Sequence, residues 1–183
     1  MKMPLRTGFL CLLLLMAGSC KNRLQKHGEL FSDLMKSSDG IFRGLHLGDS
    51  PDIVQQAETI TPTEEDNASL MYEMQLGGSG TCKIIYGFEN KHLFEILAEA
   101  SFENQKDGLE MLYGFRDYFN EKYGPYEKER GNLVWKVKGN GEDAGAILEM
   151  TDESEFSYLG LWSLSIYKPL ISNEVAADSL IIN

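Results

Sequence analysis

The chain has 183 residues, of which 28 are Asp or Glu and 17 are Lys or Arg, giving a net charge of −11. This length suits a single domain with a sizeable apolar core. The charge argues against a nucleic acid as partner, because domains that bind nucleic acids carry an excess of positive charge.

The first twenty residues have the pattern of an export signal. Lys2 and Arg6 precede an apolar run from Phe9 to Met16, which is shorter than the roughly 20 residues that span a bilayer. Small residues then lead to Cys20, and this pattern resembles a bacterial lipoprotein signal. The resemblance implies cleavage before Cys20, a lipid on its sulfur and, because Lys21 follows, sorting to the outer membrane. The alternatives are a protein released after cleavage and an uncleaved anchor.

Three basic residues, Lys21, Arg23 and Lys26, follow closely after Cys20, the residue predicted to carry the lipid. They either lie in a solvated tether or contact anionic lipid head groups. In the second case each would contribute about 1 kcal/mol to membrane binding.

Two helices are expected before the first strand. Apolar residues at near-helical spacing predict a helix that ends at Lys36. A second helix is expected to begin at Pro51, with Ser50 as its N-cap, and to end by Thr59. The polar residues 61–67 are expected to form a loop.

Alternating apolar residues predict strands, since a half-buried strand repeats every two residues. A long helix is expected at 105–123, ended by Gly124 and Pro125. Cys82 is expected to be a small buried hydrophobe, and Phe94 to lie on the buried side of its strand. The predicted strands are 70–76, 82–88, 94–102, 133–137, 146–150 and 158–167.

One helix followed by three strands therefore occurs twice, which predicts an α+β fold. We expect a tandem α-β-β-β repeat that forms one antiparallel sheet with helices packed on one face. The expected divisions are a lipoprotein signal (1–19), the lipidated cysteine with tether and first helix (20–40), one domain of two repeats (41–168, divided into 41–103 and 104–168), and a C-terminal tail (169–183).

The stretch from Gly44 to Val54 places two glycines before the start of a helix. It resembles the opening of small bacterial lipoproteins that assist outer-membrane assembly, and the tandem plan is similar to that of beta-lactamase inhibitor proteins. The single long helix at 105–123 departs from the pair of short helices usual there. The resemblance implies a protein-binding module rather than an enzyme.

The sequence offers no recognisable catalytic motif. The glycines at 77–80 lack what a nucleophile elbow or a phosphate loop requires, and we expect a hairpin turn there. His27, His46 and His92 do not have the spacing of metal ligands, and the acidic runs do not have the pattern of a calcium loop. We therefore predict no catalytic residue, no metal and no cofactor.

A sheet covered on one face leaves the other face to water or to a partner. The apolar residues expected there, as a binding face, are Met71, Ile85, Val134, Leu159, Leu161 and Tyr167. The alternative is that the C-terminal segment covers them.

These features predict a lipid-anchored cell-envelope protein that binds another envelope protein or a small ligand. The alternative is an envelope hydrolase in which two carboxylates converge in a pocket and burial raises the pKa of at least one. A structural lipoprotein without a specific ligand is the third possibility.

Overall fold

The computed structural model describes residues 23–154 and 157–169. The predicted signal peptide, Cys20 and residues 170–183 of the predicted tail lie outside the described residues. The described elements are, in chain order, α2 (Glu29–Met35), α3 (Pro51–Ala57), β1 (Glu64–Glu65), β2 (Ser69–Leu76), β3 (Gly80–Glu89), β4 (His92–Phe102), α4 (Gln105–Tyr123), β5 (Glu127–Glu129), β6 (Asn132–Lys136), β7 (Ile147–Asp152) and β8 (Gly160–Tyr167).

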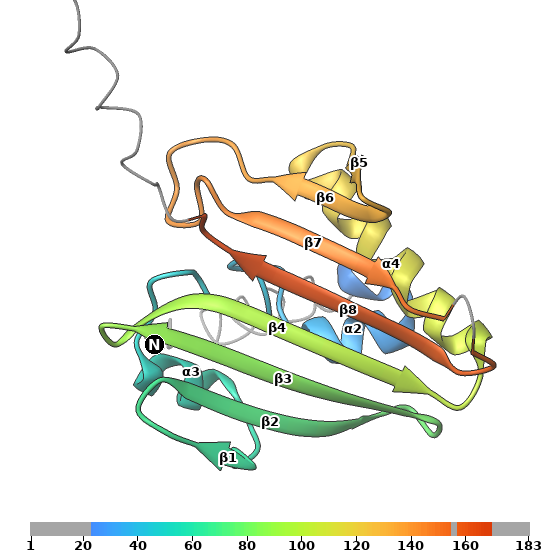
Figure 1. The fold of residues 1–183 in the computed structure, drawn as a ribbon, viewed down its shortest axis with the longest axis horizontal. Coiled ribbons are helices and arrows are strands. Elements are labelled where there is room, and N and C mark those ends of the chain that lie inside the picture. The colour runs from blue at the N-terminus through green and yellow to red at the C-terminus, as the bar shows by residue number, and fades with distance from the viewer. Residues whose placement is uncertain (1–22, 155–156, 170–183) are drawn as a thin grey trace, which may run out of the picture.

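The strands of the described chain form one eight-stranded sheet in the order β1-β2-β3-β4-β8-β7-β6-β5. Every neighbouring pair is antiparallel. The first four strands and the last four are each adjacent in sequence, and the two halves meet where β4 pairs with β8 (Figure 1). The predicted α+β class with one antiparallel sheet is therefore confirmed.

The structure has one more strand at each edge of the sheet than the six that the sequence predicts. These are β1, which lies within the predicted loop at 61–67, and β5. Both consist of exposed charged residues, so they lack the apolar alternation from which strands are predicted. Short, charged edge strands hinder pairing with a strand of another molecule.

Helices α2 and α4 lie on one face of the sheet (Figure 1), with α4 against β4, β6 and β8. The ring of Phe115 lies 5.3 Å from that of Trp162 on β8, and the ring of Phe119 lies 5.3 Å from that of Trp135 on β6. Aromatic pairs of this kind add about 0.5–1.5 kcal/mol beyond their burial. The opposite face, which we call the open face, is covered by no described helix.

The ends of α4 lie where the sequence predicts them. The side chain of Asn104 accepts a hydrogen bond from a backbone N–H of the first turn, and Gly124 ends the helix with a φ of +95°. Helix α3 also begins at Pro51 with Ser50 as its N-cap, as predicted, although the side chain of Ser50 makes no capping hydrogen bond. Its first turn depends on Pro51, whose fixed φ suits that position.

Helix α4 approaches the start of β8 closely at two glycines. A Cβ on Gly108 would lie 2.6 Å from the Cα of Gly160, and a Cβ on Gly160 would lie 2.8 Å from the Cα of Gly108. Neither position has room for a side chain, so glycine is required at both for α4 to pack on the sheet.

Candidate functional site: the open face of the sheet

The side chains of the open face alternate along each strand with the buried ones. On β3, for example, Cys82, Ile84 and Tyr86 are buried, whereas Lys83 and Ile85 are partly exposed between them. Residues that are paired directly on neighbouring strands share a face. The pairing register therefore assigns the open-face residues across the whole sheet.

A line of apolar side chains crosses three strands of the open face. Met71 pairs with Ile85, and Ile85 pairs with Leu97. All three are half-buried, and we call them the apolar row. Met71 and Ile85 are among the predicted binding residues. Leu97 was missed, although it follows from the alternation that predicts its neighbours Ile96 and Ala98 as buried.

Phe94 adds an exposed aromatic ring to this face, with 40% of its surface accessible. Its predicted burial is wrong, because the register shifts between Gly87 and Phe88 and Leu93 takes the buried position instead. A Cβ on Gly87 would lie 3.2 Å from the ring of Phe94, so this ring covers the glycine. A β-bulge has thus turned an aromatic side chain toward solvent.

The predicted binding residues in the second half of the sheet, β5 to β8, differ in how much surface they expose. Tyr167 pairs with Glu95 and with Ile147, so it continues the half-buried apolar surface onto β7 and β8. Burial, followed by the charge of nearby Glu149, raises the pKa of Tyr167. Val134 pairs with Glu149 and so has the register of the open face, but it is only 4% exposed and offers little surface to a partner.

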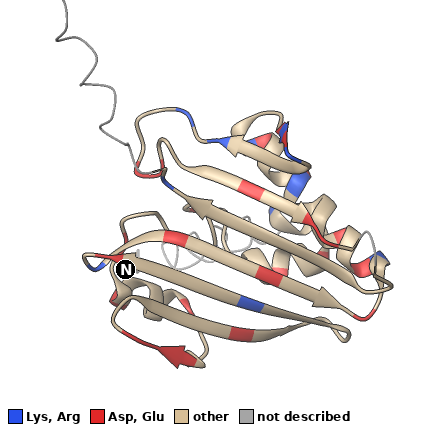
Figure 2. Cartoon of the chain, viewed as in Figure 1, with Lys and Arg blue, Asp and Glu red and all other residues tan. Residues whose placement is uncertain are grey.

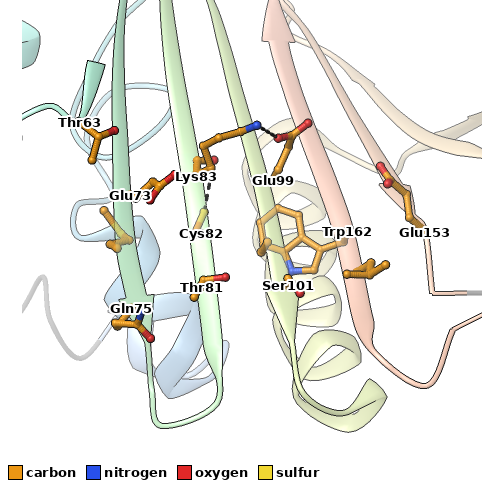
Figure 3. A pocket seen from close by; sticks show the side chains of 13 residues that line it. Thr63, Glu73, Gln75, Thr81, Cys82, Lys83, Glu99, Ser101, Glu153 and Trp162 are labelled. Carbon is orange, nitrogen blue, oxygen red and sulfur yellow. Dashed lines mark hydrogen bonds and ion pairs between the residues drawn. The ribbon is translucent and has the colours of Figure 1, made fainter. Parts of the chain in front are cut away.

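A hollow of about 650 Å³ lies beside the apolar row, over β2, β3, β4 and β8 (Figure 3). Leu161 lines it, whereas Leu159 lines a separate hollow of about 200 Å³ near the turn between β2 and β3. Within the larger hollow, Nζ of Lys83 lies 2.5 Å from Oε2 of Glu99. The hydrogen bond to Glu99 raises the pKa of Lys83. Because both side chains are well exposed, this pair adds little stability.

Carboxylates dominate the charge of the open face. Lys83 is the only Lys or Arg within β2, β3, β4, β7 and β8. The same strands carry Glu73, Glu95, Glu99 and Glu149 on this face (Figure 2). The hollow and the apolar row therefore lie in a negative field.

A second cluster of charged side chains lies in the core, on the other side of the sheet. Glu58 accepts hydrogen bonds from Nε and Nη2 of Arg43, each at 2.6 Å, from Oη of Tyr86 at 2.5 Å and from Nζ of Lys36 at 2.9 Å. Burial alone would raise the pKa of Glu58, but the bonds and charge of Arg43, with those of Tyr86 and Lys36, lower it to about 2.

This core cluster favours a structural role. The hydrolase hypothesis requires a carboxyl group whose pKa is raised, whereas the buried carboxyl of Glu58 is held as the anion. The cluster was not predicted, because Arg43 and Glu58 belong to no motif and are 15 residues apart.

Cys82 is 1% exposed, which confirms the prediction of a small buried hydrophobe. Burial raises the pKa of its thiol to about 12, so the thiol stays protonated. Within residues 23–154 and 157–169, no group of three or more His, Cys, Asp or Glu side chains is arranged to hold a metal ion. None of the described helices is long and apolar enough to cross a membrane.

No protein-family model, no characterised protein and no solved structure matches the chain. The lipoprotein signal and the resemblance of the tandem repeat to beta-lactamase inhibitor proteins therefore stay predictions from sequence.

Proposed function

We propose that the chain is a lipid-anchored protein of the cell envelope, held in the outer membrane through Cys20, that binds another envelope protein on the open face of its sheet. The observation that supports this most is the apolar row beside the exposed ring of Phe94, on a face that no described helix covers. Contiguous apolar surface with an accessible aromatic ring is typical of protein-binding sites.

The charge of the open face indicates the chemistry of the partner. Glu73, Glu95 and Glu149 lie around the apolar row, and Lys83, the only Lys or Arg within β2, β3, β4, β7 and β8, is already paired with Glu99. A partner with basic side chains beside apolar ones would match both features. Such complementarity raises the association rate and the specificity more than the affinity.

The edges of the sheet favour binding on the face over strand addition. A partner strand that joined the sheet would need the unpaired backbone of β1 or β5. These strands have two and three residues, all charged and exposed. A partner would gain few backbone hydrogen bonds there, whereas the open face offers a broad surface.

The tandem repeat is part of this proposal. Helix α3 precedes the strands β2 to β4, α4 precedes β6 to β8, and the strand order is symmetric about the contact of β4 with β8. Two joined copies of one unit would produce this order. The apolar row then belongs to the first copy and Tyr167 to the second, so that the partner contacts both.

Photo-crosslinking in intact cells tests the binding face. Phe94 is replaced by the photoreactive amino acid benzoylphenylalanine, and Tyr113 is replaced in the same way as the matched control. Both are exposed aromatic residues, at 40% and 46%, but Tyr113 lies on α4. We expect one discrete adduct from position 94 and none from position 113.

A second experiment tests whether binding of the crosslinked partner depends on the apolar and charged side chains of the open face. The partner is identified by mass spectrometry and purified, and we expect Leu97→Ala to weaken its binding by about tenfold, as for a contact worth more than 1 kcal/mol. Reversing the charge in Glu95→Lys is expected to slow association most at low salt. Equal adducts from both positions, or unchanged binding by both variants, would contradict the proposal.

A further inference from the structure

A second hollow, of about 240 Å³, lies between the residues that precede α2 and the C-terminal half of α4. In a chain with a net charge of −11, this hollow is lined by three cations and one anion. We call it the basic pocket. Its lining residues are Arg23, Lys26, His27, Ser38, Tyr118, Glu121 and Lys122.

His27 presents a buried nitrogen at this pocket. Its side chain is 4% exposed, and its ring packs against the rings of Phe31 at 5.5 Å and Tyr118 at 5.6 Å. Nε2 has no hydrogen-bond partner within the described parts of the chain. Oε2 of Glu121 lies 3.6 Å from it, too far for a hydrogen bond. An unpaired buried nitrogen is costly to a fold, so its place beside the pocket indicates a partner that the chain does not supply.

The three cations of the basic pocket differ in the hydrogen bonds and ion pairs that they already make within the protein. Nζ of Lys122 donates to the carbonyl oxygens of Ser38 and Gly40 and to Oη of Tyr118, so it supplies charge but no further hydrogen bond. Lys26 pairs with Glu121, but both side chains are half exposed, and such pairs exchange partners at little cost.

Arg23 is the cation of the pocket whose hydrogen-bond donors are not used by another described residue. Its side chain is exposed, and it makes no hydrogen bond or ion pair with another described residue. Its positive charge nevertheless acts across the pocket on Tyr118, where it opposes the rise in pKa that burial causes. A guanidinium presents paired N–H donors in one plane, which match two oxygens of a phosphate or carboxylate.

We propose that the basic pocket binds a phosphate group, with the guanidinium of Arg23 and Nε2 of His27 as hydrogen-bond donors and with Lys26 and Lys122 supplying charge. The volume fits a phosphate with a short substituent. Glu121 is the opposing charge of the site, and Lys26 screens it. A neutral imidazole that faces an oxyanion carries its proton on the facing nitrogen, so His27 serves as donor without being charged.

The position of the pocket suggests where the phosphate comes from. Arg23 lies three residues after Cys20, so a lipid on Cys20 would hold the pocket close to the membrane surface. A phospholipid head group and a free phosphate ion share the chemistry that the pocket recognises. The head-group source depends on the proposed lipid anchor, whereas phosphate binding itself depends only on the pocket.

The test uses the protein purified in a nonionic detergent and titrated with inorganic phosphate, with dihexanoyl phosphatidylglycerol and with dihexanoyl phosphatidylcholine. Binding is followed by calorimetry and by the imidazole 15N resonances of His27. We expect saturable binding that shifts Nε2. Tighter binding of phosphatidylglycerol than of phosphate supports the head-group source, and the reverse supports free phosphate.

Variants distinguish phosphate binding in the basic pocket from a general attraction of phosphate to positive charge on the protein. Arg23→Gln and His27→Phe are each expected to weaken binding about tenfold or more, as for loss of one charge-assisted hydrogen bond. Lys106→Gln, an exposed charge at the opposite end of α4, is the control and should bind as the wild type does. Arg23→Gln changes an exposed side chain, so folding is not in question. No Nε2 shift with any ligand, or equal affinity of all variants, would overturn the proposal even if Cys20 proves to carry a lipid.

Discussion

Arg43 and Glu58 form a bidentate ion pair in which both side chains are fully buried, with Nη2 of Arg43 2.6 Å from Oε2 of Glu58. The third nitrogen of the guanidinium, Nη1, donates to the backbone carbonyl of Leu34 in α2. Since Tyr86 of β3 also donates to Glu58, the pair joins the segments around α2 and α3 to the sheet. Buried pairs of this kind depend on complete partners.

Glu58→Gln tests how much the fold depends on this pair. The substitution keeps the shape of the side chain but leaves the buried guanidinium of Arg43 without a counter-charge. We expect it to lower the free energy of unfolding by about 3–5 kcal/mol, measured by urea denaturation. Glu64→Gln, at an exposed position of β1, should stay within about 0.5 kcal/mol of the wild type. A small effect of Glu58→Gln would show that water compensates Arg43.

The same carboxyl group predicts how stability depends on pH. The pKa of Glu58 falls from an ordinary value of 4.5 to about 2 in the folded protein, so its contribution is complete above about pH 4.5 and is lost as the pH falls toward 2. This shift corresponds to about 3 kcal/mol. Urea denaturation between pH 6 and pH 2 should therefore show the advantage of the wild type over Glu58→Gln shrinking by about that amount. A constant difference across this range would refute the assignment.

The contact of α4 with β8 predicts a second loss of stability. Gly108→Ala would place a methyl group 2.6 Å from the Cα of Gly160, so α4 must shift away from the sheet. We expect a cost of about 1–3 kcal/mol and a lower midpoint of thermal unfolding. Gly141→Ala is the matched control, since nothing lies within 4 Å of its added Cβ. Equal melting of the two variants would mean that α4 and β8 leave room for a methyl group at Gly108.

Cys20→Ala tests the proposed anchor. Without the sulfur no lipid can be attached, and we expect the protein to move from carbonate-washed membranes to the soluble fraction. Several acyl chains hold a protein stably because each buried CH₂ contributes about 0.8 kcal/mol. Cys11→Ala changes the cysteine that lies within the predicted signal itself and should leave the protein in the membrane. Mass spectrometry of the wild type should find the lipid on Cys20, and an unmodified Cys20 would disprove the anchor.

The sequence predicts a strand well where one of its faces is apolar. It fails where the strand forms for a reason that leaves no periodic pattern in the sequence. The six strands with alternating apolar residues are all present, because burial of one face determines both their existence and their register. The edge strands β1 and β5 bury nothing and carry only charged residues, so their formation depends on pairing with β2 and β6. Phe94 is misplaced because the bulge after Gly87 changes the phase of the alternation.

The candidate sites divide in the same way. Met71, Ile85, Leu161 and Tyr167 follow from alternation, and the structure places them on the open face. Val134 has the expected register, but its neighbours bury it. Long-range contacts are invisible to periodicity. The basic pocket brings Arg23 and His27 against Lys122, about a hundred residues later in the chain, and only the packing of α4 brings these segments together.

The acidic edges of the sheet have a consequence for molecules that the proposed lipid anchor would hold side by side. Antiparallel sheets with bare, apolar rims tend to polymerise, because each copy exposes backbone groups that the next copy can satisfy. Here one rim ends in two glutamates and the other in Glu-Lys-Glu, so approaching rims repel each other and offer at most three residues for pairing. Even at high two-dimensional density, such molecules would resist joining into fibres.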